Sequence, residues 1–131
     1  MKLLLILCLL VSTTVYAREY PATLKRVVDG DTVDLIVDLG FNIVKFERFR
    51  LYGINAPETR TRDLEEKKRG LIAKQWLIDR LATMPIIYID TLDDRKGKFG
   101  RYLANILDPN SVYTINEIMV INGLAVEYMK D

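Results

Sequence analysis

The chain has 131 residues, which is the size of a single domain. Half of the residues are hydrophobic and 28% are charged, so the composition is that of a folded domain and not of a disordered chain. The 19 basic and 18 acidic residues give a net charge of +1, so contact with a polyanion would have to depend on a local basic surface. The chain has no histidine, which excludes Ser-His-Asp triads, histidine general acid–base catalysis and His-ligated zinc.

Residues 1–17 have the pattern of a secretory signal peptide. Lys2 precedes the unbroken apolar run Leu3–Val11, and small residues precede a cleavage position after Ala17. We expect cleavage there, which would remove Cys8, the only cysteine, and leave residues 18–131 as a secreted or periplasmic domain. The alternative is an uncleaved anchor. After cleavage we expect a monomer with no stable membrane association.

Three segments that favour β-strands follow the signal peptide. Ala22–Val28 leads into the turn-forming pair Asp29-Gly30, and apolar and polar residues then alternate from Val33 to Leu39. Phe41–Tyr52 again favours a strand, and its neighbouring apolar positions suggest a bulge or bend. Residues 53–62 are expected to form a loop.

The second half of the domain adds two helices and two strands. Glu65–Thr83 is predicted to be a helix with one apolar face, and Ile86–Leu92 and Arg101–Leu107 are predicted strands separated by a charged turn. A capping box at residues 114–117 predicts a short helix that ends near Gly123. The fold class is therefore mainly β with α: a five-stranded OB-fold barrel with a helix between strands 3 and 4 and a short C-terminal helix.

Several polar residues in the turns and loops together suit phosphodiester cleavage without histidine. Asp31 and nearby loop oxygens can hold a hard cation, and Glu58 can accept a proton from water. Arg50 and Arg101 can grip a phosphate through their forked N–H groups. Each of these residues alone has an ordinary explanation as a turn, loop or surface residue, and only the combination favours catalysis.

Four motifs resemble the staphylococcal (micrococcal) nuclease family, in the same order along the chain. They are DGDTV at 29–33, FRLYGINAPE at 49–58, KFGR at 98–101 and INEIMVINGLA at 115–125. The resemblance runs from about Thr23 to Ala125. It implies a secreted calcium-dependent nuclease that hydrolyses phosphodiester bonds of DNA, with RNA as a second candidate substrate, and has little sequence preference.

The resemblance also implies a role for each matching residue. The implied calcium ligands are Asp31, Asn55 and the carbonyl of Ala56; the implied catalytic residues are Arg50, Glu58 and Arg101; and the implied nucleotide-binding residues are Lys98 and Phe99. Basic residues that could contact phosphates gather at 60–69 and at 95–101.

The sequence departs from the family pattern at several positions. Asn55 replaces a second calcium-binding aspartate, Phe99 replaces a nucleotide-contacting tyrosine, and the family's final helix has no counterpart before Asp131. These departures favour an alternative function, namely a catalytically weak OB-fold module that binds nucleic acid or protein. The retained acidic and arginine residues favour the nuclease.

Overall fold

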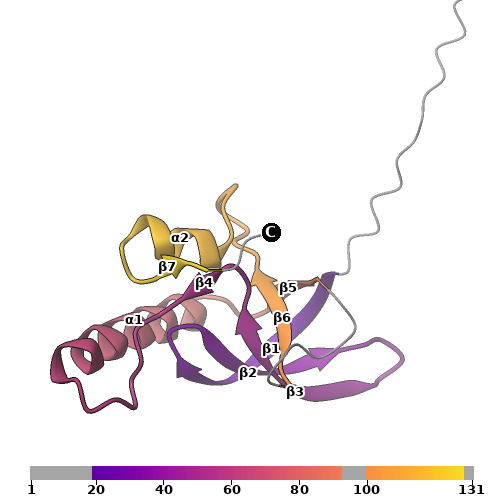
Figure 1. The fold of residues 1–131 in the computed structure, drawn as a ribbon. Helices are drawn as coiled ribbons and strands as arrows, with labels where there is room; N and C mark the ends of the chain where they lie inside the picture. The colour runs from indigo at the N-terminus through magenta and orange to yellow at the C-terminus, as the bar shows by residue number, and fades with distance from the viewer. Residues whose placement is uncertain (1–18, 93–99, 129–131) are drawn as a thin grey trace, which may run out of the picture.

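The computed structural model describes residues 19–92 and 100–128, and its central feature is a closed barrel of five strands (Figure 1). The barrel strands are β1 (Glu19–Asp29), β2 (Thr32–Asp38), β3 (Val44–Leu51), β5 (Ile87–Thr91) and β6 (Tyr102–Ile106). Their order around the barrel is β1-β2-β3-β6-β5, and pairing of β1 with β5 closes it. Only the β3–β6 pair among these is parallel. This arrangement confirms the predicted OB-fold class.

Helix α1 (Leu64–Ala82) connects the third and fourth barrel strands, as predicted. Asp63 caps its first turn, because a carboxylate oxygen of Asp63 accepts hydrogen bonds from the backbone N–H groups of Glu65 and Glu66. The buried face of α1 includes Ala73 and Leu77, which belong to the hydrophobic core together with residues of the barrel.

Helix α2 (Ile115–Ile121) has the predicted capping box. The side chain of Thr114 accepts from the N–H of Glu117, and the side chain of Glu117 accepts from the N–H of Thr114. Gly123 follows with a φ of 69°, a conformation that glycine adopts readily after a helix. Neither helix in the described part of the chain combines the length and the apolar character needed to cross a bilayer.

A second, two-stranded sheet lies outside the barrel and was not predicted. It pairs β4 (Ile54–Asn55), inside the segment expected to be a loop, with β7 (Val126–Glu127) near the C-terminus. The N–H of Tyr128 continues this contact by donating to the carbonyl of Gly53 at 2.9 Å. The end of the described chain therefore lies along the loop that carries the candidate site (Figure 1).

The bulge or bend predicted between Phe41 and Tyr52 is present only as the turn at Phe41 and Asn42, whose φ angles are 55° and 60°, and β3 itself has no bulge. The β2–β3 register is continuous, and the irregular positions lie in β1, near Lys25 and Val28. Neighbouring apolar residues such as Ile43 and Val44 are instead exposed at the β2–β3 hairpin, where no core imposes strict alternation. Within the described residues, the buried hydrophobic core lies between residues 22 and 125.

Candidate functional site

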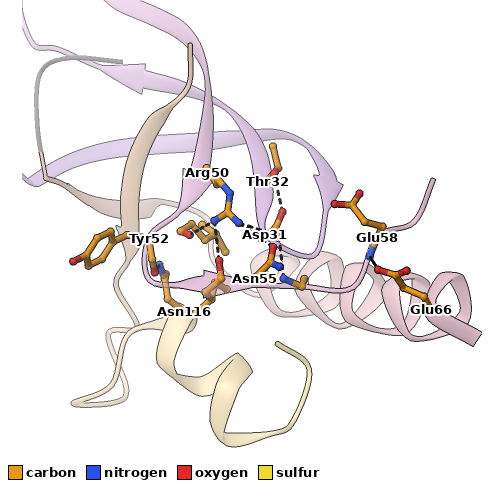
Figure 2. A network of polar contacts seen from close by, with 11 residues as sticks. Asp31, Thr32, Arg50, Tyr52, Asn55, Glu58, Glu66 and Asn116 are labelled. Carbon is orange, nitrogen blue, oxygen red and sulfur yellow. Dashed lines mark hydrogen bonds and ion pairs between the residues drawn. The ribbon is translucent and has the colours of Figure 1, made fainter. Parts of the chain in front are cut away.

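Asp31 occupies the turn between β1 and β2, and both of its carboxylate oxygens are hydrogen-bonded. Oδ1 accepts from the hydroxyl of Thr32 at 2.9 Å, and Oδ2 accepts from the backbone N–H of Ala56 at 3.0 Å (Figure 2). The side chain is only 13% exposed. The bond to Ala56 links the β1–β2 turn directly to the loop after β4, so the first and second nuclease-like motifs meet in space.

Gly30 allows this close approach of the turn to the loop. A Cβ atom at position 30 would lie 2.9 Å from the Cβ atoms of both Ala56 and Ala73. Such distances leave no space for a side chain. The turn, the loop and α1 therefore meet at a glycine, and the Asp29-Gly30 pair has a packing role beyond that of a simple hairpin turn.

Arg50, near the end of β3, is enclosed by acceptors from the same loop. Its Nη1 donates to the carbonyl of Ile54 at 2.7 Å and to that of Leu51 at 3.3 Å. Its Nη2 donates to Oδ1 of Asn55 at 3.0 Å and lies 3.8 Å from Oδ2 of Asp31. The side chain is 15% exposed. These contacts fix the direction in which the guanidinium points.

The C-terminal segment also contacts this arginine. The aromatic ring of Tyr128 lies 5.2 Å from Cζ of Arg50, which is within the range of a cation–π contact. Pairing of β7 with β4 puts Tyr128 there. The sequence analysis did not identify Tyr128 as a site residue, because its placement depends on a two-residue sheet that local patterns do not reveal.

Glu58 is exposed on the loop between β4 and α1, and contacts on both sides hold this loop. The N–H of Glu58 donates to Oε1 of Glu66 on α1 at 3.3 Å, and the hydroxyl of Thr59 donates to the carboxylate of Asp29. In Figure 2 the side chains of Arg50 and Glu58 lie on opposite sides of Asp31.

Gly70 positions this loop from the helix side. A Cβ atom at position 70 would lie 2.7 Å from the carbonyl oxygens of both Pro57 and Glu58. The sequence analysis missed this role. A glycine in the middle of a predicted helix is itself a signal of close packing, because glycine otherwise destabilises a helix.

Asn116 lies in the motif at residues 115–125, and the sequence analysis assigned no role to its side chain. It is 1% exposed, and its Nδ2 donates to the carbonyl oxygens of Tyr52 at 2.9 Å and Ala104 at 3.1 Å. Its Oδ1 accepts from the N–H of Ile106 at 3.1 Å. Asn116 therefore ties α2 to β6 and to the end of β3, just before the loop that holds Arg50.

The remaining predicted site residues belong to the KFGR motif. Arg101 is half-buried and immediately precedes β6, which runs beside the end of β3. Lys98 and Phe99 lie outside the described residues. The structure thus brings together Asp31, Arg50, Asn55 and Ala56, and the functional roles of all these residues stay predictions.

The donor atoms near Asp31 suit a hard cation but supply little charge. Within the described ranges, no group of three or more Asp, Glu, His or Cys residues could hold a metal ion. One carboxylate from Asp31 and one amide oxygen from Asn55 form an oxygen-only donor set, which fits calcium with several water ligands. Both donors also contact Arg50, so the guanidinium would compete with a bound cation.

Comparison with known proteins identifies the family. The family model described as "Staphylococcal nuclease homologue" matches residues 48–131, which is more than half of the chain. The chain belongs to the staphylococcal nuclease family. No curated protein matches it. The matched region includes Arg50, Asn55, Ala56, Glu58 and Arg101 of this nuclease-family domain. Asp31 lies before that region, and its hydrogen bond from Ala56 is what connects it to the matched loop.

Proposed function

We propose that this nuclease-family domain is a calcium-dependent phosphodiesterase that cleaves DNA, and RNA as a second substrate, with little sequence preference. The observation that carries the proposal is the convergence of Asp31, Arg50 and the loop at 54–58 on one surface. Family membership makes nuclease chemistry the first candidate for such a surface.

Each residue has a distinct part in the proposed reaction. Arg50 binds the oxygens of the scissile phosphate and stabilises the extra negative charge of the transition state. Glu58 takes a proton from the attacking water, which suits its exposed position. Arg101 is proposed as a second phosphate contact.

Asp31, the amide oxygen of Asn55 and the carbonyl of Ala56 would hold the calcium ion. When bound, the ion would neutralise phosphate charge. The ordering of Asp31 by Thr32 and Ala56 means that its carboxylate needs little rearrangement to meet a cation.

Purified residues 18–131, incubated with plasmid and single-stranded DNA, test the proposal. Cleavage should occur with calcium and stop with a chelator, whereas undiminished cleavage in chelator would contradict the proposed role of calcium. Glu58→Gln should lower the rate by about 10²–10⁴-fold. Arg50→Lys should lower it by about 10²-fold, because lysine lacks the forked donor geometry. Glu65→Gln, an exposed acidic position on α1, is the matched control and should keep the wild-type rate.

A second candidate function is a catalytically weak module that binds nucleic acid or protein. The enclosure of Arg50 by Asn55 and two backbone carbonyls favours it, because a phosphate would have to displace some of these acceptors. Binding of a labelled oligonucleotide without calcium-stimulated cleavage would support this candidate over the nuclease.

The proposed location is the periplasm or the exterior of the cell, with residues 1–17 removed as a signal peptide. Residues 1–18 lie outside the described part of the chain, so the proposal rests on the apolar run Leu3–Val11 and the small residues after it. Mass spectrometry of the exported protein should show Arg18 as the first residue. A retained Met1 would support the uncleaved anchor. We propose that the mature domain is a monomer, which light scattering would test.

A further inference from the structure

Arg50 is the first member of a row of side chains on the outer face of the barrel. Phe49 and Leu51 on β3 are buried in the core, whereas Arg50, Arg48 and Phe46 alternate with them and point outward. Side chains two residues apart on a strand lie about 6.7 Å from each other. The row from Arg50 to Phe46 therefore extends about 13 Å away from the candidate site, toward the β2–β3 hairpin.

The middle of this row is a cluster of two arginines that share one carboxylate. Asp34 on β2 pairs with Arg48 on β3 and with Arg26 on β1 in the strand register. Its Oδ1 accepts from Nε of Arg48 at 2.7 Å, and its Oδ2 accepts from Nη2 of Arg48 at 3.0 Å and from Nε of Arg26 at 2.8 Å. The hydrogen bond from Arg48, followed by that from Arg26, lowers the pKa of Asp34 to about 2, so the carboxylate is charged at neutral pH.

The exposed part of this cluster consists of guanidinium groups. The side chain of Asp34 is 7% exposed, whereas those of Arg26 and Arg48 are 61% and 43% exposed. Asp34 offsets the charge of one guanidinium group, and the carboxylate of Asp29 at the end of β1 also acts on Arg48, so the cluster offers exposed N–H donors and little net charge. Within the described residues, the hydrogen bonds to Asp34 use Nε of Arg26 and Nε and Nη2 of Arg48, which leaves the other terminal amino groups of both arginines to face a ligand. The buried carboxylate of Asp34 holds both guanidinium groups in position, and guanidinium groups bind phosphate well through paired N–H bonds.

The far end of the row pairs an aromatic ring with a cation. Phe46 is 49% exposed, and Nζ of Lys25 lies 3.8 Å from the centre of its ring. Proteins bind single-stranded nucleic acid through aromatic side chains on which bases stack and through neighbouring cations that contact phosphates. In OB-fold proteins the face of the second and third strands binds oligonucleotides.

We propose that Arg26, Arg48, Phe46 and Lys25 form an outer-face track that binds an extended single strand of nucleic acid leaving the cleavage site. This inference deepens the proposed nuclease function and rests on it. At about 13 Å, the track has room for about two nucleotides beyond the phosphate held at Arg50. A base stacks on Phe46, and the two arginines and Lys25 contact phosphates.

The track is tested by measuring binding in the presence of a chelator. The protein is residues 18–131 carrying Glu58→Gln, which prevents cleavage of the probe. The probes are fluorescent thymidine oligonucleotides of two and eight nucleotides, and the readout is anisotropy at several salt concentrations. Arg48→Gln should weaken binding of the octamer by about 5-fold or more and lower its salt slope by about 0.7, because one phosphate contact is lost. Binding of the dinucleotide should not change.

Phe46→Ala and Lys25→Gln supply independent measurements that leave the arginine–aspartate cluster intact. Phe46→Ala should weaken octamer binding by about 5-fold or more with no change in salt slope, because stacking involves no counterion release. Lys25→Gln should lower the salt slope. Lys68→Gln tests the competing basic group at residues 60–69, since Lys68 is an exposed cation on α1. If the octamer follows the outer-face track, Lys68→Gln should weaken octamer binding less than the track variants do.

Three results would overturn the proposal. The first is an equal loss of dinucleotide and octamer binding in the track variants, and the second is no loss of octamer binding in any track variant. The third is a loss of octamer binding in Lys68→Gln without a loss in the track variants. The test of the track can succeed or fail independently of the test of the proposed nuclease function. If the protein with native Glu58 cleaves no DNA but Arg48→Gln still loses octamer binding selectively, the nuclease proposal fails and the track stands as a binding surface.

Discussion

Gly70→Ala tests whether the packing of α1 against the loop at 57–58 supports the site. The new methyl group would lie 2.7 Å from the carbonyl oxygens of Pro57 and Glu58, and 2.8 Å from the carbonyl carbon of Glu58. These are backbone atoms, so no side-chain rotation can relieve the contact. Because the N–H of Glu58 is bonded to Glu66 on the same helix, a shift of the loop also strains that bond.

The magnitude follows from two opposing effects. Alanine improves helix propensity over glycine by about 1 kcal/mol, whereas overpacking at a site without space costs about 1–3 kcal/mol. Contact with two backbone oxygens puts this site at the upper end, so we expect a net loss of about 1–2 kcal/mol and a fall in Tm of about 4–8 °C. A displacement of Glu58 by about 1 Å would lower the cleavage rate by about 10²-fold.

Thermal unfolding followed by circular dichroism, together with initial rates of plasmid cleavage, measures both effects. Gln75→Ala is the matched control, because Gln75 is exposed on the same helix and its side chain bonds to Asp79. That variant should stay within about 0.5 kcal/mol of wild type and keep its rate. If Gly70→Ala is at least as stable as wild type and cleaves DNA at the wild-type rate, the loop does not depend on the glycine contact and the reasoning is refuted.

Three further predictions concern charge and hydrogen bonding. Asn55→Asp adds a carboxylate next to Asp31. It should lower the calcium concentration for half-maximal cleavage by about tenfold from the wild-type value, which we expect at about 10⁻⁴–10⁻³ M. Unchanged curves of calcium binding by calorimetry and of rate against calcium would mean that residue 55 acts on Arg50 and not on the metal. Asn116→Ala removes the hydrogen bonds to the carbonyls of Tyr52 and Ala104 and from the N–H of Ile106, although the carbonyl of Ala104 keeps the N–H of Tyr52. The free energy of unfolding in urea should fall by about 2–4 kcal/mol, and a variant as stable as wild type would contradict this. The pKa of Asp34 is lowered from 3.8 to about 2 in the folded state, so its stabilisation is complete above about pH 4 and is lost as the pH falls through about 2. The stability advantage of wild type over Asp34→Asn should therefore be about 1–2 kcal/mol at pH 6 and shrink toward pH 2, and an advantage that does not vary with pH would count against the arginine pairing.

Local patterns were sufficient for the five barrel strands, the two helices and their order, but not for β4 and β7. Alternation of apolar residues from Val33 to Leu39 predicted β2, and the apolar face around Ala73 and Leu77 predicted α1. The capping box at Thr114 marked the start of α2 to the residue. These signals depend only on neighbours within a few positions, so a single sequence carries them in full.

The motifs also indicated which residues belong to one site, but not how they contact one another. Asp31, Arg50, Asn55 and Ala56 lie together, yet the bonds from Ala56 to Asp31 and from Arg50 to Asn55 depend on the packing of the turn against the loop. The sequence indicated that Asn55 is neutral. Only the structure shows that its amide oxygen accepts a hydrogen bond from the arginine expected to bind phosphate.

The tertiary structure alone decided the contacts between segments that are distant in the chain. Asn116 bonds to the carbonyl of Tyr52 across 64 positions, and β7 pairs with β4 over a similar separation. Arg26, Asp34 and Arg48 form one cluster because three strands meet in a particular register. The physical reason is that periodicity and capping signals report whether a segment is a helix or a strand, whereas its partner is chosen by burial and hydrogen bonding across the whole fold.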